Sequence, residues 1–317
     1  MKSSACSAEI SGPTFEDLCR LCAASQLECR LVPWRITRPM AANRTPVSLR
    51  LLRLARLAVH LVRGIAIAWL RFPKLSEAEK QAQTRRWSNT LLSILSVSVR
   101  EHNAPEELPG RCMLALNHIS WLDIFVVDAR FPATFIAKSE IRSWPMVGWL
   151  STLVGTLYIE RGKRSAARHA RQTIAAELER GTLIAVFPEG ITSFGRSLER
   201  FHSALFQPAL DAKATLQPVA LRYLDAAGQH TDAAGYVGDT SLLESVWTIV
   251  STRRMVAEFN LLAPISVHAQ TRRSLAEKTE TAIAGALGVP APRGPSRARH
   301  LPHKTPGTNA DPPDEPH

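Results

Sequence analysis

Cysteine is scarce in this sequence, with only five among 317 residues. Cys6, Cys19, Cys22 and Cys29 lie in the first 40 residues, and Cys112 is the fifth. The Cys19–Cys22 spacing would suit two zinc ligands, but no second cysteine pair or histidine pair follows at zinc-finger spacing. The cysteines therefore predict neither a metal site nor a disulfide framework, and they fit a reducing cytosol.

The sequence also lacks a long apolar run and a secretory signal. One uncharged stretch, residues 143–159, contains Pro145 and two glycines and is shorter than the ~18 residues that mark a membrane span. We expect it to form a short buried helix followed by a strand. Acidic residues occupy the N-terminal positions where a signal peptide would need basic and apolar residues.

Acidic residues are outnumbered, with 28 Asp and Glu against 39 Lys and Arg, a net charge of +11. Residues 43–100 contain eleven basic and two acidic residues, a local charge of +9. This imbalance predicts an anionic partner, either a nucleic acid or an acidic membrane surface.

The basic residues of segment 50–71 follow a helical pattern. At 100° per residue, six of them fall within roughly 140° of a helical wheel, and the intervening positions are mostly Leu, Val, Ile, Ala and Trp. They are Arg50, Arg53, Arg56, His60, Arg63 and Arg71. A basic amphipathic helix is typical of proteins that lie in the interface of an anionic bilayer. The alternative is a helix packed on the protein's own core with its arginines in water.

Composition divides the chain into four parts. Residues 1–42 form an extension that is either disordered or a mis-assigned translation start, since Met40 could begin a shorter chain. Residues 43–100 are predicted to form two amphipathic, membrane-associating helices, the second over 87–99. Residues 101–287 form the main domain, and the Pro-rich residues 288–317 are expected to be disordered.

The main domain alternates apolar strands with amphipathic helices. Strands are predicted by short apolar runs at 111–116, 131–137, 156–159, 182–187, 216–222 and 256–262. Helices are predicted over 165–180, where Gly181 provides a C-terminal stop, and over 270–287. This order indicates an α/β fold with a mixed sheet flanked by helices, preceded by the N-terminal two-helix motif.

A histidine and an aspartate follow the first of these strands in the motif Asn117-His118-x-x-x-x-Asp123. Positions five apart on one helix diverge, so His118 and Asp123 can meet only where the strand turns into a helix. There Asp123 could accept a hydrogen bond from one imidazole nitrogen and leave the other as a base. On the spacing alone, a histidine that caps a loop is the favoured explanation.

Three further motifs follow in order. They are Gly155-x-x-x-Ile159-x-Arg161, Phe187-Pro-Glu189-Gly190 and Pro218-Val-Ala. With Asn-His-x4-Asp, this set resembles the four blocks of the glycerolipid acyltransferase family, which includes the 1-acylglycerol-3-phosphate acyltransferases. The resemblance covers roughly residues 110–225, and segment 43–100 resembles the membrane-binding helices of bacterial members.

The resemblance implies a catalytic pair. His118 would act as the general base and Asp123 as its partner, while a lysolipid hydroxyl attacks an acyl thioester. Arg161 would contact the acceptor's phosphate, Glu189 and Gly190 would shape the acceptor site, and Lys138 would lie near it. Alternatively, Glu189 forms a core salt bridge with Arg161, and Lys138 is a surface charge.

The resemblance also implies the ligands and the location. No metal or bound cofactor is expected, because acyl-coenzyme A or acyl-carrier protein is a cosubstrate. The protein would be peripheral or monotopic at the cytoplasmic face of the inner membrane, with anionic lipids as partners, and residues 143–159 could line an acyl chain. The leading acceptor is 1-acyl-sn-glycerol-3-phosphate, and lyso-ornithine lipid is the alternative.

One block departs from the family pattern. Many members continue Phe-Pro-Glu-Gly with Thr-Arg-Ser, where the arginine helps to hold phosphate, but this chain has Ile191-Thr192-Ser193. Arg196 could substitute for the missing arginine. Related enzymes of a bacterial subgroup that also lacks this arginine acylate lyso-ornithine lipid, which carries no phosphate.

Other classes of protein fit less well. A nucleic-acid binder would explain the charge, but the arginines share a helix with a strongly apolar face and no aromatic stacking module is visible. A serine hydrolase would need Gly-x-Ser-x-Gly, which is absent. A catalytically inactive membrane adaptor on the same fold remains the non-enzyme alternative.

Overall fold

The structure is a computed structural model that describes residues 45–139, 156–159 and 164–292. Its strands are β1 (Val97–His102), β2 (Cys112–Leu116), β3 (Thr134–Lys138), β4 (Leu157–Ile159), β5 (Ile184–Val186), β6 (Thr215–Leu224) and β7 (Met255–Leu261). Its α-helices are α2 (Val47–Leu70), α3 (Glu77–Ile94), α4 (Leu122–Asp128), α6 (Arg164–Glu179), α7 (Gln207–Asp211), α8 (Leu242–Ser251) and α9 (Arg272–Leu287). Short 3-10 helices cover Phe72–Lys74, Ser203–Phe206 and Asp232–Ala234.

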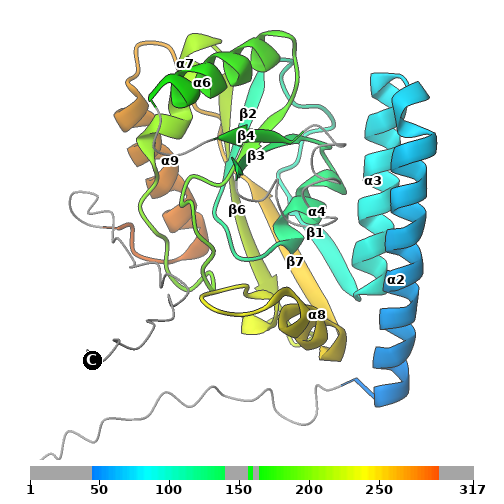
Figure 1. Cartoon of the computed structure of the whole chain (residues 1–317). Helices are drawn as coiled ribbons and strands as arrows, with labels where there is room; N and C mark the ends of the chain where they lie inside the picture. Colours follow the sequence, from blue (N-terminus) through cyan, green and yellow to red (C-terminus); the bar gives the residue numbers. More distant parts are fainter. Residues whose placement is uncertain (1–44, 140–155, 160–163, 293–317) are drawn as a thin grey trace, which may run out of the picture. The chain divides into compact units, whose positions relative to one another are not determined.

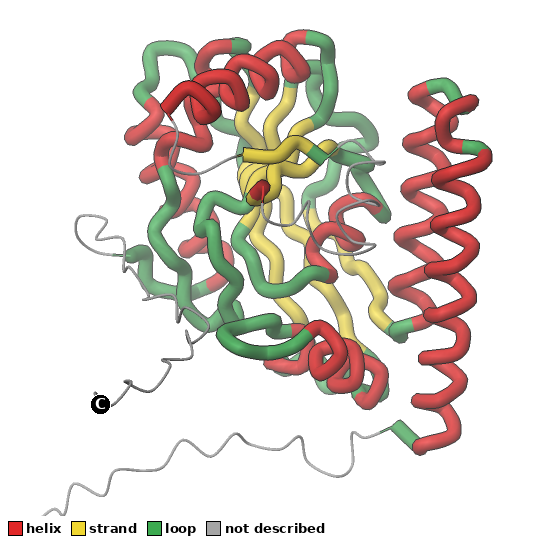
Figure 2. The backbone as a smooth tube through the Cα atoms, viewed as in Figure 1, coloured by secondary structure: helices red, strands yellow, loops and turns green. Residues whose placement is uncertain are grey.

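The strands form one mixed sheet in the order β1-β7-β6-β2-β5-β3-β4. Neighbouring strands are parallel except β6 and β7, which are antiparallel. Figures 1 and 2 show helices on both faces of this sheet. This confirms the predicted α/β class, and the apolar runs proposed as strands lie at or within about two residues of the observed ones at most ends.

The central strands are apolar throughout because both of their faces are covered. In β2, Met113 and Ala115 pack with α6, α7 and α9 on one face, whereas Leu114 and Leu116 pack with α3 and α4 on the other. Both faces of β2 are therefore buried.

The second N-terminal helix differs from the prediction. We expected a helix over 87–99, but α3 begins at Glu77, with a Ser76 capping box, and ends at Ile94. Ser96 then takes a left-handed conformation with φ of 57°, and Val97 starts β1 beside β7. The prediction that the helix continues to residue 99 was wrong. Val97 and Val99 fit an apolar position in a strand as well as in a helix, and β-branched residues favour strands.

Helix α2 packs against α3 and α8 through an inner face that includes Arg53 and His60. Arg53 is only 6% exposed and donates to the carbonyls of Val250, Thr252 and Arg253 at the end of α8. His60 stacks on Trp87 of α3 with 4.8 Å between ring centroids. Part of the predicted basic face thus points into the protein.

The outer face of α2 is apolar instead. Its exposed side chains include large hydrophobic residues along the whole helix, namely Val47, Leu49, Leu51, Leu52, Val59, Val62, Trp69 and Leu70. The helix does pack on the protein's own core, through residues such as Leu54, Leu57 and Leu61, and Arg56 and Arg63 are exposed, but Arg53 is buried and much of the apolar side faces outward. Within the described residues, no helix is both long enough and apolar enough to cross a bilayer.

Asp128, the last residue of α4, is a buried carboxyl group whose charge state affects the stability of the fold. Its Oδ1 accepts the Ala133 N–H at 3.0 Å, and burial raises the pKa of this carboxyl to about 8. Between an unfolded pKa of ~4 and about 8, the folded state holds a proton that the unfolded state releases. The free energy of unfolding therefore falls as pH rises through this window.

Asp128→Asn keeps the acceptor and removes the charge. We expect the variant to be more stable than the wild-type protein at pH 8, by an amount on the order of a few kcal/mol, and equally stable near pH 4. Urea unfolding across this range measures the difference. Glu189 titrates in both proteins, so its contribution cancels in the comparison. Parallel curves of unfolding free energy against pH for the two proteins would contradict a buried, neutral Asp128.

Candidate active site

The His118–Asp123 pair forms at the turn between β2 and α4. His118 Nδ1 lies 2.8 Å from Asp123 Oδ2, and Asp123 is fully buried while the His118 side chain is about one-fifth exposed. The structure thus brings the two together where the strand turns into a helix. Asp123 occupies the first turn of α4, where the helix dipole favours a carboxylate.

Four donors converge on the Asp123 carboxyl group. Besides His118, the backbone N–H groups of Ile119 and Ser120 donate to Oδ2 at 2.7 and 2.9 Å. The Tyr223 hydroxyl donates to Oδ1 at 2.8 Å, and burial together with the Asp123 charge holds the pKa of Tyr223 well above its usual value. Both oxygens are therefore fixed, and Nδ1 of His118 is held as the donor to Asp123.

Neighbouring strands fix the backbone around His118. The Asn117 side chain exchanges two hydrogen bonds with the backbone of Leu221 on β6, at 2.9 and 2.8 Å. The His118 carbonyl accepts the Ser193 N–H at 2.9 Å. Sequence reasoning missed Asn117 and Tyr223 as supporting residues. Asn117 directly precedes the histidine, and Tyr223 lies on β6, the strand that contains the Pro218-Val-Ala motif.

Glu189 lies behind the pair and holds the backbone. Its Oε1 accepts the His118 N–H at 2.7 Å, and its Oε2 accepts the Glu199 N–H at 2.8 Å. Burial raises the pKa of Glu189 to about 8, although the hydrogen bonds from Glu199 and His118 act in the opposite direction. Glu189 is only 3% exposed, so any effect it has on chemistry at His118 would pass through the position of the His118 backbone.

Glu189→Gln tests this positioning. An amide has one oxygen to offer, so either the His118 or the Glu199 N–H would face an NH2 group, at a cost of about 1–3 kcal/mol. We expect kcat to fall by about tenfold or more, with a smaller change in KM. Glu199→Gln is the matched control because it leaves the Glu199 backbone N–H in place. Equal rates for both variants would contradict the role of Glu189.

Two further residues of the Phe-Pro-Glu-Gly motif shape the turn. Phe187 stacks on the His118 ring with 4.0 Å between centroids, and Phe135 of β3 stacks on Phe187. Gly190 has φ of 70° and donates its N–H to the Phe187 carbonyl, which favours glycine at this position. The motif thus covers one face of the imidazole, and the His118 side chain keeps about one-fifth of its surface exposed.

The remaining predicted site residues are less completely described. Lys138 ends β3, but its side chain lies outside the described residues, as does the whole of Arg161. Arg196 forms a two-pronged ion pair with Asp232, at 2.9 and 3.2 Å. Thr192, at the position of the family arginine, donates its hydroxyl to the Tyr236 carbonyl. Most of stretch 143–159 also lies outside the described residues.

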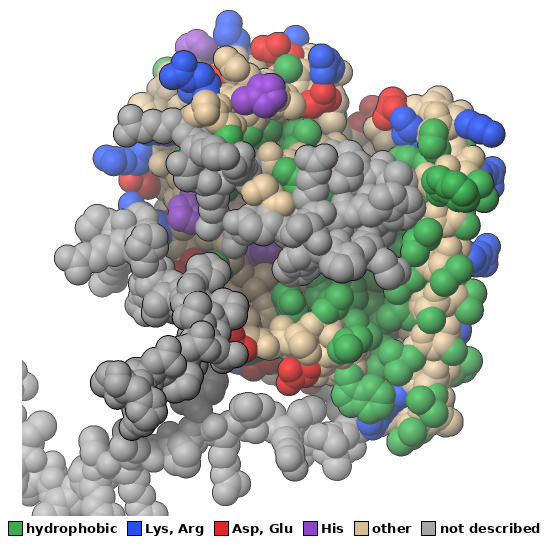
Figure 3. Space-filling model, viewed as in Figure 1, with side chains coloured by type: hydrophobic (Ala, Val, Ile, Leu, Met, Phe, Trp, Pro, Cys, Tyr) green, Lys and Arg blue, Asp and Glu red, His purple; other side chains and the backbone are tan. Residues whose placement is uncertain are grey.

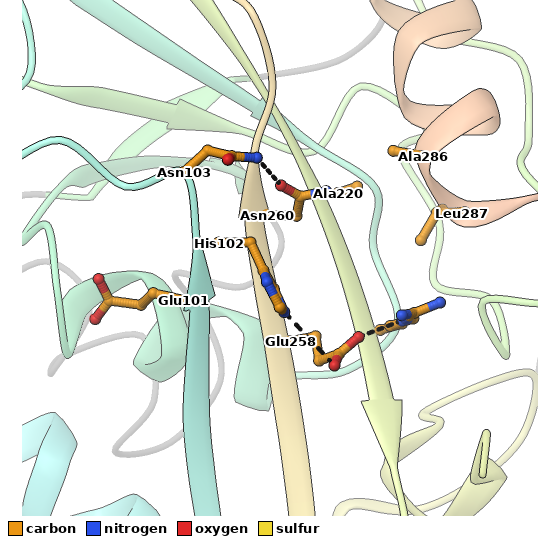
Figure 4. A pocket seen from close by; sticks show the side chains of 9 residues that line it. Glu101, His102, Asn103, Ala220, Glu258, Asn260, Ala286 and Leu287 are labelled. Carbon is orange, nitrogen blue, oxygen red and sulfur yellow. Dashed lines mark hydrogen bonds and ion pairs between the residues drawn. The ribbon is translucent and has the colours of Figure 1, made fainter. Parts of the chain in front are cut away.

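A separate pocket of about 420 Å³ lies where β1, β6 and β7 meet the end of α9. There Glu258 accepts from Arg222 at 2.5 Å and lies 3.6 Å from His102 (Figure 4). Arg100, which does not line the pocket, donates to the same carboxylate at 2.9 Å. The lining residue Glu101 pairs with Arg130 outside the pocket, and His118 does not line it. In the described part of the chain, no group of three or more His, Cys, Asp or Glu side chains is placed to hold a metal ion.

Comparisons with known proteins relate this chain to one family. A model of the Acyltransferase family matches residues 96–222, from the turn before β1 into β6. A lyso-ornithine lipid O-acyltransferase of Pseudomonas aeruginosa is 37% identical over 256 residues, which cover 78% of this chain and 97% of that protein. A 1-acyl-sn-glycerol-3-phosphate acyltransferase of Neisseria meningitidis is 34% identical, covering 77% and 95%.

The fold also matches a solved structure. The crystal structure of the 1-acyl-sn-glycerophosphate (LPA) acyltransferase from Thermotoga maritima superposes with a TM-score of 0.58 at 17% identity, covering 76% of this chain and 94% of that one. At this identity the likeness shows a common fold. Together with the full-length relatives, these findings show that the chain is an enzyme that belongs to the glycerolipid acyltransferase family.

Proposed function

We propose that the protein transfers an acyl chain from a thioester to the free hydroxyl of a lysolipid, with His118 as the general base. The observation that carries this proposal is the hydrogen bond between His118 Nδ1 and the fully buried Asp123. With Nδ1 committed to Asp123, Nε2 is the nitrogen that can accept a proton.

The chemistry needs no nucleophile from the protein. Nε2 takes the proton of the acceptor hydroxyl as its oxygen attacks the thioester carbonyl carbon, which forms the C–O bond. The tetrahedral intermediate then breaks the C–S bond, and the imidazolium returns the proton to the departing thiolate. The products are the acylated lipid and a free thiol, and the buried carboxylate stabilises the imidazolium between the two steps. The donor would be acyl-coenzyme A or acyl-carrier protein.

A membrane surface is the place where a water-soluble thioester and a bilayer-resident lysolipid meet. The outer face of α2 supports this location, since Val62 is 66% exposed and Trp69 70% exposed beside Arg63. Figure 3 shows hydrophobic side chains along the length of this helix. An exposed apolar helix face edged by arginines is suited to the headgroup region of an anionic bilayer. We therefore infer that α2 lies in the membrane interface.

Val62→Glu tests this inference. The variant loses the burial of an apolar side chain in lipid and adds a negative charge near anionic headgroups, so partitioning onto anionic vesicles should weaken about tenfold. Gln172→Glu, which adds the same charge to an exposed position of α6, should partition like the wild-type protein. Vesicle sedimentation measures both, and equal binding by the two variants would contradict an interfacial α2.

The leading acceptor in this proposal is 1-acyl-sn-glycerol-3-phosphate, which would give phosphatidic acid. The Neisseria meningitidis relative with this activity in its name supports it, as does Arg161, an arginine in the motif where the family contacts phosphate. A forked guanidinium is well suited to phosphate oxygens.

Lyso-ornithine lipid is the second candidate acceptor. It is favoured by the Pseudomonas aeruginosa relative and by the pairing of Arg196 with Asp232, which engages the guanidinium that could otherwise replace the missing phosphate arginine. Lyso-ornithine lipid carries both an ammonium and a carboxylate group. Its binding therefore needs less unpaired positive charge from the protein than the binding of a phosphate group does.

A competition assay tests the acceptor. The full chain is offered equal concentrations of both lysolipids, with one acyl thioester, and the two products are quantified by mass spectrometry. A higher kcat/KM for lysophosphatidate, lost in Arg161→Ala, is the expected result. A preference for lyso-ornithine lipid that is insensitive to Arg161→Ala would overturn the leading acceptor and leave the acyl-transfer chemistry in place.

A further inference from the structure

We propose that α8 is a second membrane-contact element, which inserts into the anionic bilayer beside α2 and holds the active site at a set distance from it. The proposal rests on the membrane location inferred above and concerns a helix outside both the catalytic motifs and the N-terminal two-helix motif. Its residues are Leu242, Leu243 and Trp247, which together form the α8 patch.

The three side chains of the α8 patch are largely exposed, and Arg50 lies over one of them, Trp247. Leu243 is 82% exposed and Trp247 is 46% exposed, although both residues are among the most costly to leave in water. The only charged side chain of α8 is Glu244, in the first turn of the helix. An exposed Leu and Trp one helical turn apart are typical of a segment that enters the headgroup region, where Trp is enriched.

The patch is continuous with the outer face of α2. The Arg50 guanidinium lies over the Trp247 ring, 5.8 Å from its centroid, and α2 packs directly against α8. Figure 3 shows hydrophobic side chains along α2 and over the region where Figure 1 places α8, on the same face of the molecule. Arg50 thus supplies a cation at the seam, which favours an anionic lipid surface over a second apolar protein.

The inner side of α8 is anchored to α2 at one end. Arg53 donates to the carbonyls of Val250 and Thr252 at 2.9 and 2.7 Å, and to Ser96 Oγ at 2.6 Å. These carbonyls are the unpaired acceptors of the last turn, where a cation also complements the helix dipole. A buried arginine with several hydrogen bonds makes α2 and the end of α8 one rigid surface.

The middle of α8 is anchored to the catalytic turn. Trp121, the residue before α4, donates its indole N–H to Ser245 Oγ at 3.0 Å. Trp121 lies between His118 and Asp123 in the sequence and caps the helix that carries Asp123. A bilayer that receives Leu243 and Trp247 on the outer side of α8 would therefore lie next to the turn that binds the lysolipid hydroxyl.

Leu243→Glu is the direct test, with Gln172→Glu on α6 as the matched control for added charge. Both positions are exposed, so both variants should unfold at the wild-type temperature. On vesicles of equimolar phosphatidylglycerol and phosphatidylcholine, Leu243→Glu should bind about tenfold more weakly than wild-type or Gln172→Glu. Equal binding by all three would overturn the proposal.

A conservative variant tests whether the Trp247 side chain reaches the lipid, without altering the charge of the protein. Brominated lipids quench indole fluorescence on contact, so Trp247→Phe should lose part of the quenching that the wild-type protein shows on vesicles of brominated phosphatidylglycerol. Unchanged quenching, or a wild-type dimer that Leu243→Glu converts to a monomer in sedimentation velocity, would overturn the bilayer as the occupant. None of these measurements depends on acyl transfer, so failure of the proposed chemistry would be recognised separately.

Discussion

Replacement of His118 by alanine is expected to lower kcat for acyl transfer by about 10²–10⁴, the usual effect of removing a positioned acid–base group. The two carboxyl groups described beside the imidazole are poor substitutes for it, because Asp123 is fully buried and Glu189 is engaged with backbone N–H groups. The lysolipid and thioester should still bind, so KM should change much less than kcat.

The control for this loss is another histidine. His169 lies exposed on α6, and His169→Ala should keep the wild-type rate. A loss of less than tenfold in a folded His118→Ala protein would contradict His118 as the base.

Asp123→Asn is expected to produce the second large effect, a fall in kcat of about 10²–10⁴ with little change in substrate binding. The Asp123 carboxylate accepts from His118, Ile119, Ser120 and Tyr223. Asparagine can offer only one oxygen, so either the backbone donors or the tyrosine would face its NH2 group. An NH2 group opposite His118 would also favour the tautomer with the proton on Nε2, which cannot act as a base.

Tyr223→Phe separates the two functions of the carboxylate. Phenylalanine removes one donor to Oδ1 and leaves the contacts of Oδ2 with His118 intact. We expect a fall in kcat of less than about tenfold, at the scale of one lost hydrogen bond. If Tyr223→Phe and Asp123→Asn reduced the rate equally, the carboxylate would be acting through its support of the fold and not through the tautomer of His118.

The sequence predicted best those elements whose pattern is set by burial alone. Strands such as β2 and β5 are apolar on both sides because helices cover both faces, so they appear as continuous runs between polar segments. The end of α3 could not be predicted in the same way. It depends on the left-handed turn at Ser96, a residue that Arg53 holds from another helix.

The same distinction holds for α2 and α8. A helical wheel shows that α2 has a basic side and an apolar side, but not which side faces the protein, and the burial of Arg53 decides this. Helix α8 was missed altogether, although Ser241 and Glu244 have the spacing of a helix start and Ser241 caps the helix.

At the site, local spacing identified the pair and tertiary contacts completed it. His118 and Asp123 are only five residues apart, at the turn between β2 and α4, so their contact follows from local geometry. Tyr223 comes from a strand 100 residues away, and Glu189 reaches the His118 backbone from 71 residues away. Contacts at such separations require the sheet order, which no motif in a single sequence encodes.

The most direct test of acyl transfer is a mass measurement of the products. The full chain is mixed with an acyl thioester, lysophosphatidate and lyso-ornithine lipid, and His118→Ala is treated in parallel. The account predicts that at least one lysolipid gains a single acyl chain, with one thiol released per lipid formed, and that His118→Ala forms almost none. Acylation of neither lipid, or equal acylation by both proteins, would contradict it.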